Sequence, residues 1–164
     1  MRANCEIAIL NFPHEKSREG FKTKISARNV FPGRITQVKT GAVNPEVDLT
    51  TTPGLQIVGI VTNESVQSLG LAIGKQATAL VKASSVLVSL EGTDVKLSAR
   101  NCLTGKITAV HEGPTSAEVT INLPSGAAIR ATITYDASRE LGLQTGLTAT
   151  AVFKAQSVIF AVAA

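Results

Sequence analysis

The chain has 164 residues, a formal net charge of +4 and a pI near 9.3. It is 44% hydrophobic but only 4% aromatic and has no Trp, so its core has to be built from Val, Ile, Leu and Ala, a palette that favours strands. No apolar run reaches the roughly 18 residues of a membrane span, the N-terminus lacks the order of a signal peptide, and Cys5 and Cys102 lack the spacing of a disulfide scaffold or a zinc site. We therefore expect a soluble, cytoplasmic protein with reduced thiols and no metal bound directly by its side chains.

The predicted elements begin after a polar, turn-rich extension at residues 1–23. A strand starts within the hexapeptide KISARN (24–29) and runs to a turn at residues 40–41, and a second strand carries Val47 and Leu49 and ends at the turn sequence TPG (52–54). A third strand covers 55–61 and a short helix covers 63–69, with Thr62 as N-cap and Gly70 just past the C-terminus. Two further strands are expected at 77–82 and 86–90.

The same order of elements is then repeated. The hexapeptide KLSARN at 96–101 matches KISARN at an offset of 72 residues, and this offset continues without a gap, with about 26 of 67 positions identical. The chain is therefore a tandem duplication. We expect a first domain at 24–90, a short polar linker at 91–95 and a second domain at 96–164.

Five strands with a helix between the third and the fourth are the order of an OB-type barrel. The predicted fold class is therefore all-β, with two tandem OB-type five-stranded barrels, each with one short helix between strands 3 and 4.

The motifs SARN, EVDL (46–49), VTNESVQSLGL (61–71) and LVKASSV (80–86) resemble the molybdate-binding Mop or TOBE family over about 140 of the 164 residues. The tandem arrangement is similar to the di-Mop molbindins, which are small cytoplasmic molybdate-storage proteins. It is also similar to the C-terminal half of the molybdate-responsive transcription regulator. The resemblance implies storage of molybdate, with tungstate as a second possible ligand. The 23-residue extension is too short for the regulator's winged-helix domain, which favours the stand-alone binding protein. The alternative is the effector-binding domain of that regulator without its DNA-binding domain.

Several repeated polar residues are candidate ligands for a tetrahedral dianion, which needs compensating charge and many hydrogen-bond donors when it leaves water. The candidates in the first repeat are Ser26, Ala27, Arg28, Thr62, Ser65, Lys82 and Ala83. Hydroxyls, a guanidinium and an ammonium supply donors, and the two alanines offer backbone amides beside little bulk. The family implies that such residues meet across a subunit interface.

The second repeat retains most of this set, namely Ser98, Ala99, Arg100, Thr134, Lys154 and Ala155. Ala137 stands where the first repeat has Ser65, so one hydroxyl is missing unless Ser138 replaces it. We expect weaker anion binding there, by about 10- to 100-fold for one hydrogen bond to a charged group.

Other interpretations of these residues stay open. The arginines can be solvated, the lysines can protect edge strands, and the two threonines can serve as helix caps alone. Asn29 and Asn101 are expected to bond local backbone rather than ligand.

Nucleic-acid binding is disfavoured because the chain has few aromatic side chains for stacking, and no catalytic constellation emerges that would make it an enzyme. A lone barrel encloses a dianion poorly, so we expect the chain to form an oligomer. The resemblance to the tandem storage proteins implies a homotrimer, and the resemblance to the regulator implies a homodimer as the alternative.

Overall fold

A computed structural model describes residues 25–52, 54–90 and 96–163. The first repeat contains β1 (Asn29–Lys39), β2 (Glu46–Thr51), β3 (Gln56–Ile60), α1 (Asn63–Leu69), β4 (Gln76–Val81), the 3-10 turn η1 (Ala83–Ser85) and β5 (Leu87–Leu90). The second contains β6 (Asn101–Glu112), β7 (Ser116–Asn122), β8 (Ala128–Thr134), α2 (Tyr135–Glu140), β9 (Thr148–Phe153), η2 (Ala155–Ser157) and β10 (Val158–Ala161). The predicted fold class is confirmed, whereas the predicted extension and linker lie outside the described residues.

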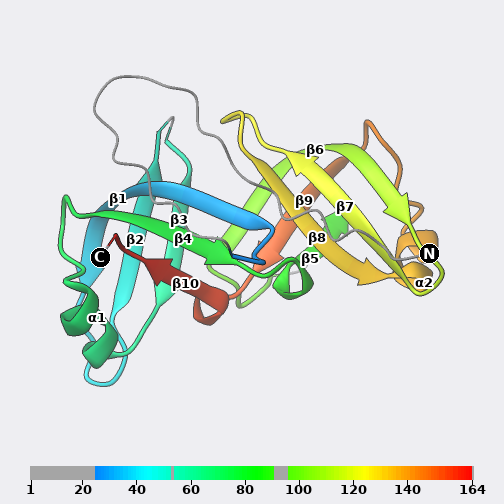
Figure 1. The fold of residues 1–164 in the computed structure, drawn as a ribbon. Coiled ribbons are helices and arrows are strands. Elements are labelled where there is room, and N and C mark those ends of the chain that lie inside the picture. The colour runs from blue at the N-terminus through cyan, green and yellow to red at the C-terminus, as the bar shows by residue number, and fades with distance from the viewer. Residues whose placement is uncertain (1–24, 53, 91–95, 164) are drawn as a thin grey trace.

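The two five-stranded antiparallel sheets exchange their last strands. Their orders are β10-β4-β1-β2-β3 and β5-β9-β6-β7-β8, so each sheet takes its fifth strand from the other repeat. In Figure 1 the red β10 lies in the barrel that is otherwise blue to green, and the green β5 lies in the yellow and orange one. Each sheet curls until its edge strands contact each other, β10 with β3 and β5 with β8. The repeat pattern did not predict this exchange.

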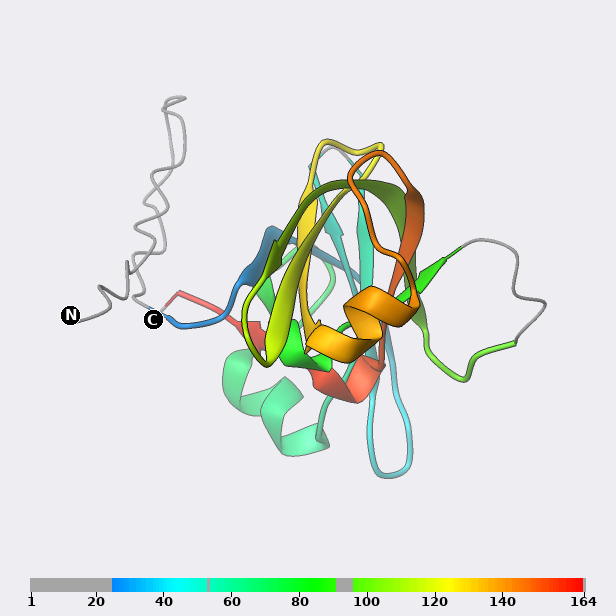
Figure 2. The same cartoon turned by 90° about the vertical axis from the view of Figure 1, so that its right-hand side faces the viewer.

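Figure 2 looks along the line between the barrels, with the second repeat's strands in front. The cores are mainly aliphatic, as the composition predicted: Val47, Leu49 and Ile57 in one barrel and Val119, Ile121 and Ile129 in the other are fully buried. Three aromatic side chains, Phe31, Phe153 and Phe160, are buried with them. At the described positions, no helix is long and apolar enough to cross a membrane.

The asparagine of each SARN motif joins the two repeats. Asn101 is buried, donates from Nδ2 to the Val58 carbonyl at 2.8 Å and accepts from the Val58 amide at 2.8 Å. Asn29 makes the same pair of bonds with the backbone of Arg130, at 2.8 and 2.7 Å. Backbone bonding was predicted, but the partner is the other repeat's third strand rather than a local group. The repeated asparagine of the two hexapeptides thus makes a reciprocal contact between the repeats.

Candidate functional site

Strand register places each SAR tripeptide beside the lysine of its own repeat. Asn29 pairs with Val81, which precedes Lys82, and Asn101 pairs with Phe153, which precedes Lys154. Both lysines are exposed and directly precede a 3-10 turn. The SAR tripeptide and the lysine of the same repeat therefore lie near each other in the fold.

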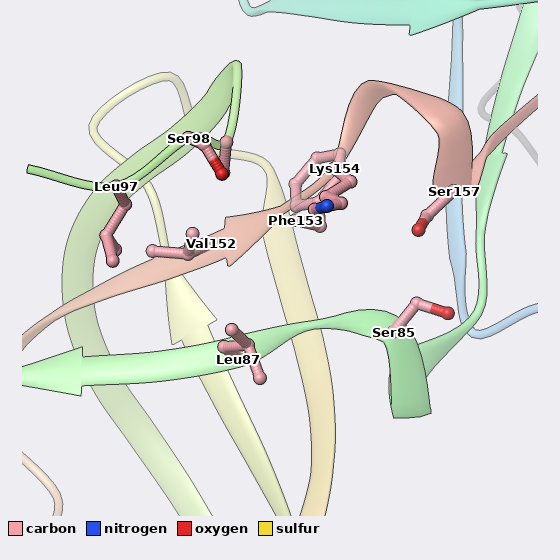
Figure 3. Close-up of a pocket in the computed structure, with 9 residues that line it drawn as sticks. Ser85, Leu87, Leu97, Ser98, Val152, Phe153, Lys154 and Ser157 are labelled. Carbon is pink, nitrogen blue, oxygen red and sulfur yellow. The ribbon is translucent and has the colours of Figure 1, made fainter.

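A hollow of about 320 Å³ lies at this place in the second repeat (Figure 3). The described residues that line it are Ser85, Leu87, Leu97, Ser98, Ala99, Val152, Phe153, Lys154 and Ser157. Figure 3 shows the Lys154 amine between the hydroxyl of Ser98 and those of Ser85 and Ser157. The lining therefore offers one ammonium and three hydroxyls, and no acidic side chain is among these described residues. Donors without a competing carboxylate are what an oxyanion requires.

Two of the polar residues of this lining, Ser85 and Ser157, were not predicted from the sequence. They end the two 3-10 turns and are equivalent at the 72-residue offset, so their repetition was a usable signal. The missing information was the strand exchange, because only the pairing of β5 with β9 brings Ser85 of the first repeat to the Lys154 of the second.

The repeat offset maps this lining onto a matching surface of the first repeat. Ser26 and Lys82 are exposed there, Ala27 is half-buried, and the outward-facing Ile25 and Ile159 stand where the hollow has Leu97 and Leu87. Ala83 and Ala155 are buried as the first residues of η1 and η2, so their side chains pack inside the fold.

The proposed role of the lysines as guards of a sheet edge does not fit. Lys82 follows β4 and Lys154 follows β9, and each of these strands is paired on both sides. An exposed lysine at the end of an interior strand has no edge to protect.

The two arginines are not among the residues that line the hollow, and they contact the other repeat instead. Arg100 donates from a terminal nitrogen to Glu46 Oε1 at 3.1 Å, and Arg28 Nε lies 3.7 Å from Glu118 Oε2. They are thus neither freely solvated nor part of the hollow's lining.

Thr62, Ser65 and Thr134 lie at the helix starts and outside the residues that line the hollow. The N-cap prediction is confirmed, because Thr62 Oγ1 accepts from the Ser65 amide at 3.1 Å and Thr134 Oγ1 from the Ala137 amide at 3.2 Å. Thr62 follows Ile60, which is in register with Glu46 and hence with the end of β1 remote from Asn29. The two threonines therefore do not come close to the lysines of their own repeat.

Ser138 does not replace the hydroxyl that Ala137 lacks. Its side chain is buried and donates to Glu112 Oε1 at 3.1 Å. Among the segments that the structure describes, no group of three or more His, Cys, Asp or Glu residues could hold a metal ion.

Comparison with known proteins identifies the repeats. The model of the TOBE domain matches residues 25–88 and again 97–160. The molybdenum transport protein ModE of Azotobacter vinelandii is 45% identical over 139 residues, which are 85% of this chain and 51% of that protein. The molybdenum-pterin-binding protein MopA of Rhodobacter capsulatus is 40% identical over 84% of this chain and 52% of its own length. The chain spans about half the length of the curated relatives it matches.

A solved structure matches more completely. The cytoplasmic molybdate-binding protein ModG, crystallised with molybdate bound, is 46% identical, and the match covers 86% of this chain and 100% of that chain with a TM-score of 0.82.

Proposed function

Because this chain belongs to the TOBE domain family, we propose that it binds molybdate reversibly, without catalysis, for molybdenum storage and homeostasis in the cytoplasm. The observation that carries the proposal is the hollow in which Ser98 and Lys154 meet Ser85 and Ser157 without an acidic neighbour in its described lining. The likeness to ModG, whose molybdate-bound form has a closely similar fold, supports the same ligand class.

Binding follows from charge and donor number. An ammonium and several hydroxyls replace part of the hydration that the dianion loses. Leu87, Leu97 and Val152, once covered by a second copy, would limit the access of water and strengthen each polar contact. Every interaction is non-covalent, so the anion leaves as it entered. Tungstate has the same charge and shape and is a second expected ligand.

The remaining site residues are proposed to arrive from a neighbouring subunit. Thr62, Ser65 and Thr134 cannot reach the lysines of their own repeat through the fold described above, and Arg28 and Arg100 are only half covered. Leu87 and Ile159, at the rims of the two lysine surfaces, are 64% and 65% exposed. Burial of such apolar groups against a second copy would close the site. A homotrimer is the expected assembly, with a homodimer as the alternative.

A regulatory role is the second candidate. ModE of Azotobacter vinelandii is about twice as long as the matched region, so the same two repeats also occur as part of a longer protein. In that case the chain would be the effector-binding half of a molybdate-responsive transcription regulator.

Calorimetric titration with molybdate tests the proposal. The intact protein should bind molybdate and ignore an equal concentration of sulfate. Lys154→Ala and Lys82→Ala should each weaken binding by about 10- to 100-fold, the effect of losing one charged hydrogen bond. Lys75→Ala, an exposed lysine in the turn before β4, is the matched control and should change little. Full affinity in the Lys82→Ala, Lys154→Ala double variant would refute the site, and native mass spectrometry of the same samples would count subunits and anions.

A further inference from the structure

Each arginine of the two SARN motifs forms an ion pair with a glutamate of the opposite repeat. Arg100 contacts Glu46, and Arg28 contacts Glu118, and both members of the second pair lie 72 positions from those of the first. Because the same contact occurs at equivalent positions in both repeats, we attribute it to the fold and not to an accidental side-chain conformation at one surface site.

These contacts occupy the groups proposed to bind the anion. A guanidinium bonded to a carboxylate has already neutralised its charge and used one of its five donors. A carboxylate beside that guanidinium also repels an arriving dianion, and the repulsion is stronger when the carboxylate is shielded from water by protein. Glu46 is shielded in this way, since its side chain is only 16% exposed.

We propose that Glu46 and Glu118 are latch carboxylates, which hold the arginines between the repeats in the anion-free protein and weaken anion binding so that the stored anion can be released. The proposal rests on the proposed function, because it assumes that Arg28 and Arg100 bind molybdate. The glutamates act through the arginines and are positioning residues, not ligands.

The two latches differ in strength. Lys39 Nζ donates to Glu46 Oε1 at 2.8 Å and fixes that carboxylate beside Arg100. His111 occupies the position equivalent to Lys39 and stands opposite Glu118 in register. Glu118 is more exposed, at 30%, and its arginine is farther away, at 3.7 Å against 3.1 Å. The latch at Glu46 should therefore oppose the anion more strongly than the latch at Glu118.

Substitution separates this role from a purely structural one. Glutamine has the length of glutamate and keeps an acceptor oxygen for the arginine but carries no charge, whereas aspartate keeps the charge. If charge competition operates, Glu46→Gln tightens molybdate binding and Glu46→Asp does not. If the glutamate only fixes the arginine for the anion, both changes weaken binding.

The test is calorimetric titration of the intact protein with molybdate. We expect Glu46→Gln to bind about 5- to 10-fold more tightly and Glu118→Gln about 2- to 3-fold more tightly, a range set by partly buried ion pairs. Glu140→Gln removes the same charge from an exposed glutamate with no ion pair among the described residues, and it should match the unmodified protein. Unchanged or weaker binding by Glu46→Gln would overturn the latch.

A double-mutant cycle adds a readout that general electrostatics cannot imitate. In an Arg100→Ala background, Glu46→Gln should tighten binding clearly less than in the unmodified protein, because the arginine that Glu46 restrains is gone and only the direct repulsion between Glu46 and the anion remains. Should Glu46→Gln fail to fold, Lys39→Ala tests the same contact: it removes the group that fixes Glu46 beside Arg100 and should tighten binding about 2- to 3-fold, whereas Lys75→Ala, which removes the same charge elsewhere, should not. Equal effects of the two lysine variants would count against the latch.

The two proposals fail in different ways. If the unmodified protein does not bind molybdate, the proposed function is wrong. If it binds molybdate and the glutamine variants bind no more tightly, only the latch is wrong.

Discussion

At the scale of single residues, the side chains of one SARN motif make contacts both within their own repeat and with the other repeat. Its serine lies beside the lysine of its own repeat, whereas its arginine and asparagine reach the other repeat. The sequence marked all of these positions as special through their repetition. The sequence could not show which way each of these side chains points, because adjacent side chains at the start of a strand point to opposite faces. The partner of each side chain depends on the tertiary structure.

The asparagine contact gives the first prediction. Asn101→Ala leaves the amide and the carbonyl of Val58 without partners inside the protein, and should lower the free energy of unfolding by about 2 to 4 kcal/mol. Asn29→Ala should have a similar effect through Arg130. Urea unfolding followed by circular dichroism measures both.

The exposed Asn122, whose side chain accepts one bond from Thr108 at 3.3 Å, supplies the control. Asn122→Ala should cost at most a few tenths of a kcal/mol. A loss below about 0.5 kcal/mol in Asn101→Ala would show that water satisfies the freed backbone groups.

At the scale of elements, most of the fold was predictable because it depends on local signals. The helix bounds 63–69, the Thr62 cap and the left-handed Gly70, with φ of 59°, follow from residues close together in the chain. The exchange of β5 and β10 does not. Leu87 and Ile159 are equivalent positions of two short apolar strands, each of which is in register with β9 or β4 of the other repeat, and no pattern local to β5 or β10 indicates which repeat the strand joins.

Packing of the exchanged strand gives the second prediction. A Cβ added at Gly59 of β3 would lie 2.4 Å from the ring of Phe160 on β10 and 3.3 Å from the Val158 Cβ. Gly59→Ala should therefore cost about 1 to 3 kcal/mol of unfolding free energy, the usual range for overpacking. The second barrel has Ala131 and Val88 at the equivalent positions. The double variant Gly59→Ala, Phe160→Val copies that pair and should recover part of the loss.

Thermal unfolding of the two single variants and the double variant gives the coupling energy. Additive effects would mean that Gly59 and Phe160 do not contact each other in solution.

At the scale of the whole molecule, the two repeats form one structural unit. Each sheet is completed by the other repeat, and the buried Asn29 and Asn101 bond across the same boundary. The duplication was visible in the sequence, and the resemblance that it carries suggested the proposed class of anion. The composition of the hollow was not, since it takes Ser85 and Leu87 from one repeat and Ser98 and Lys154 from the other.

This unity gives the third prediction. A chain cut down to residues 24–90 keeps β1 to β5 but loses β10, so the edge of β4 is left unpaired. It should form a dimer by placing β5 of each copy in the sheet of the other, with no folded monomer at micromolar concentration. Size-exclusion chromatography with light scattering checks this, and a stable folded monomer would show that β5 can close its own barrel.

The crossed strands also constrain how such a protein can evolve. After an ordinary duplication each copy is free to drift, because a defect in one leaves the other intact. Here a change in the last strand of the second copy alters the barrel of the first, as Phe160 beside Gly59 illustrates. Selection therefore acts on the copies as reciprocal pairs, and the two halves can specialise only at positions that face neither exchanged strand.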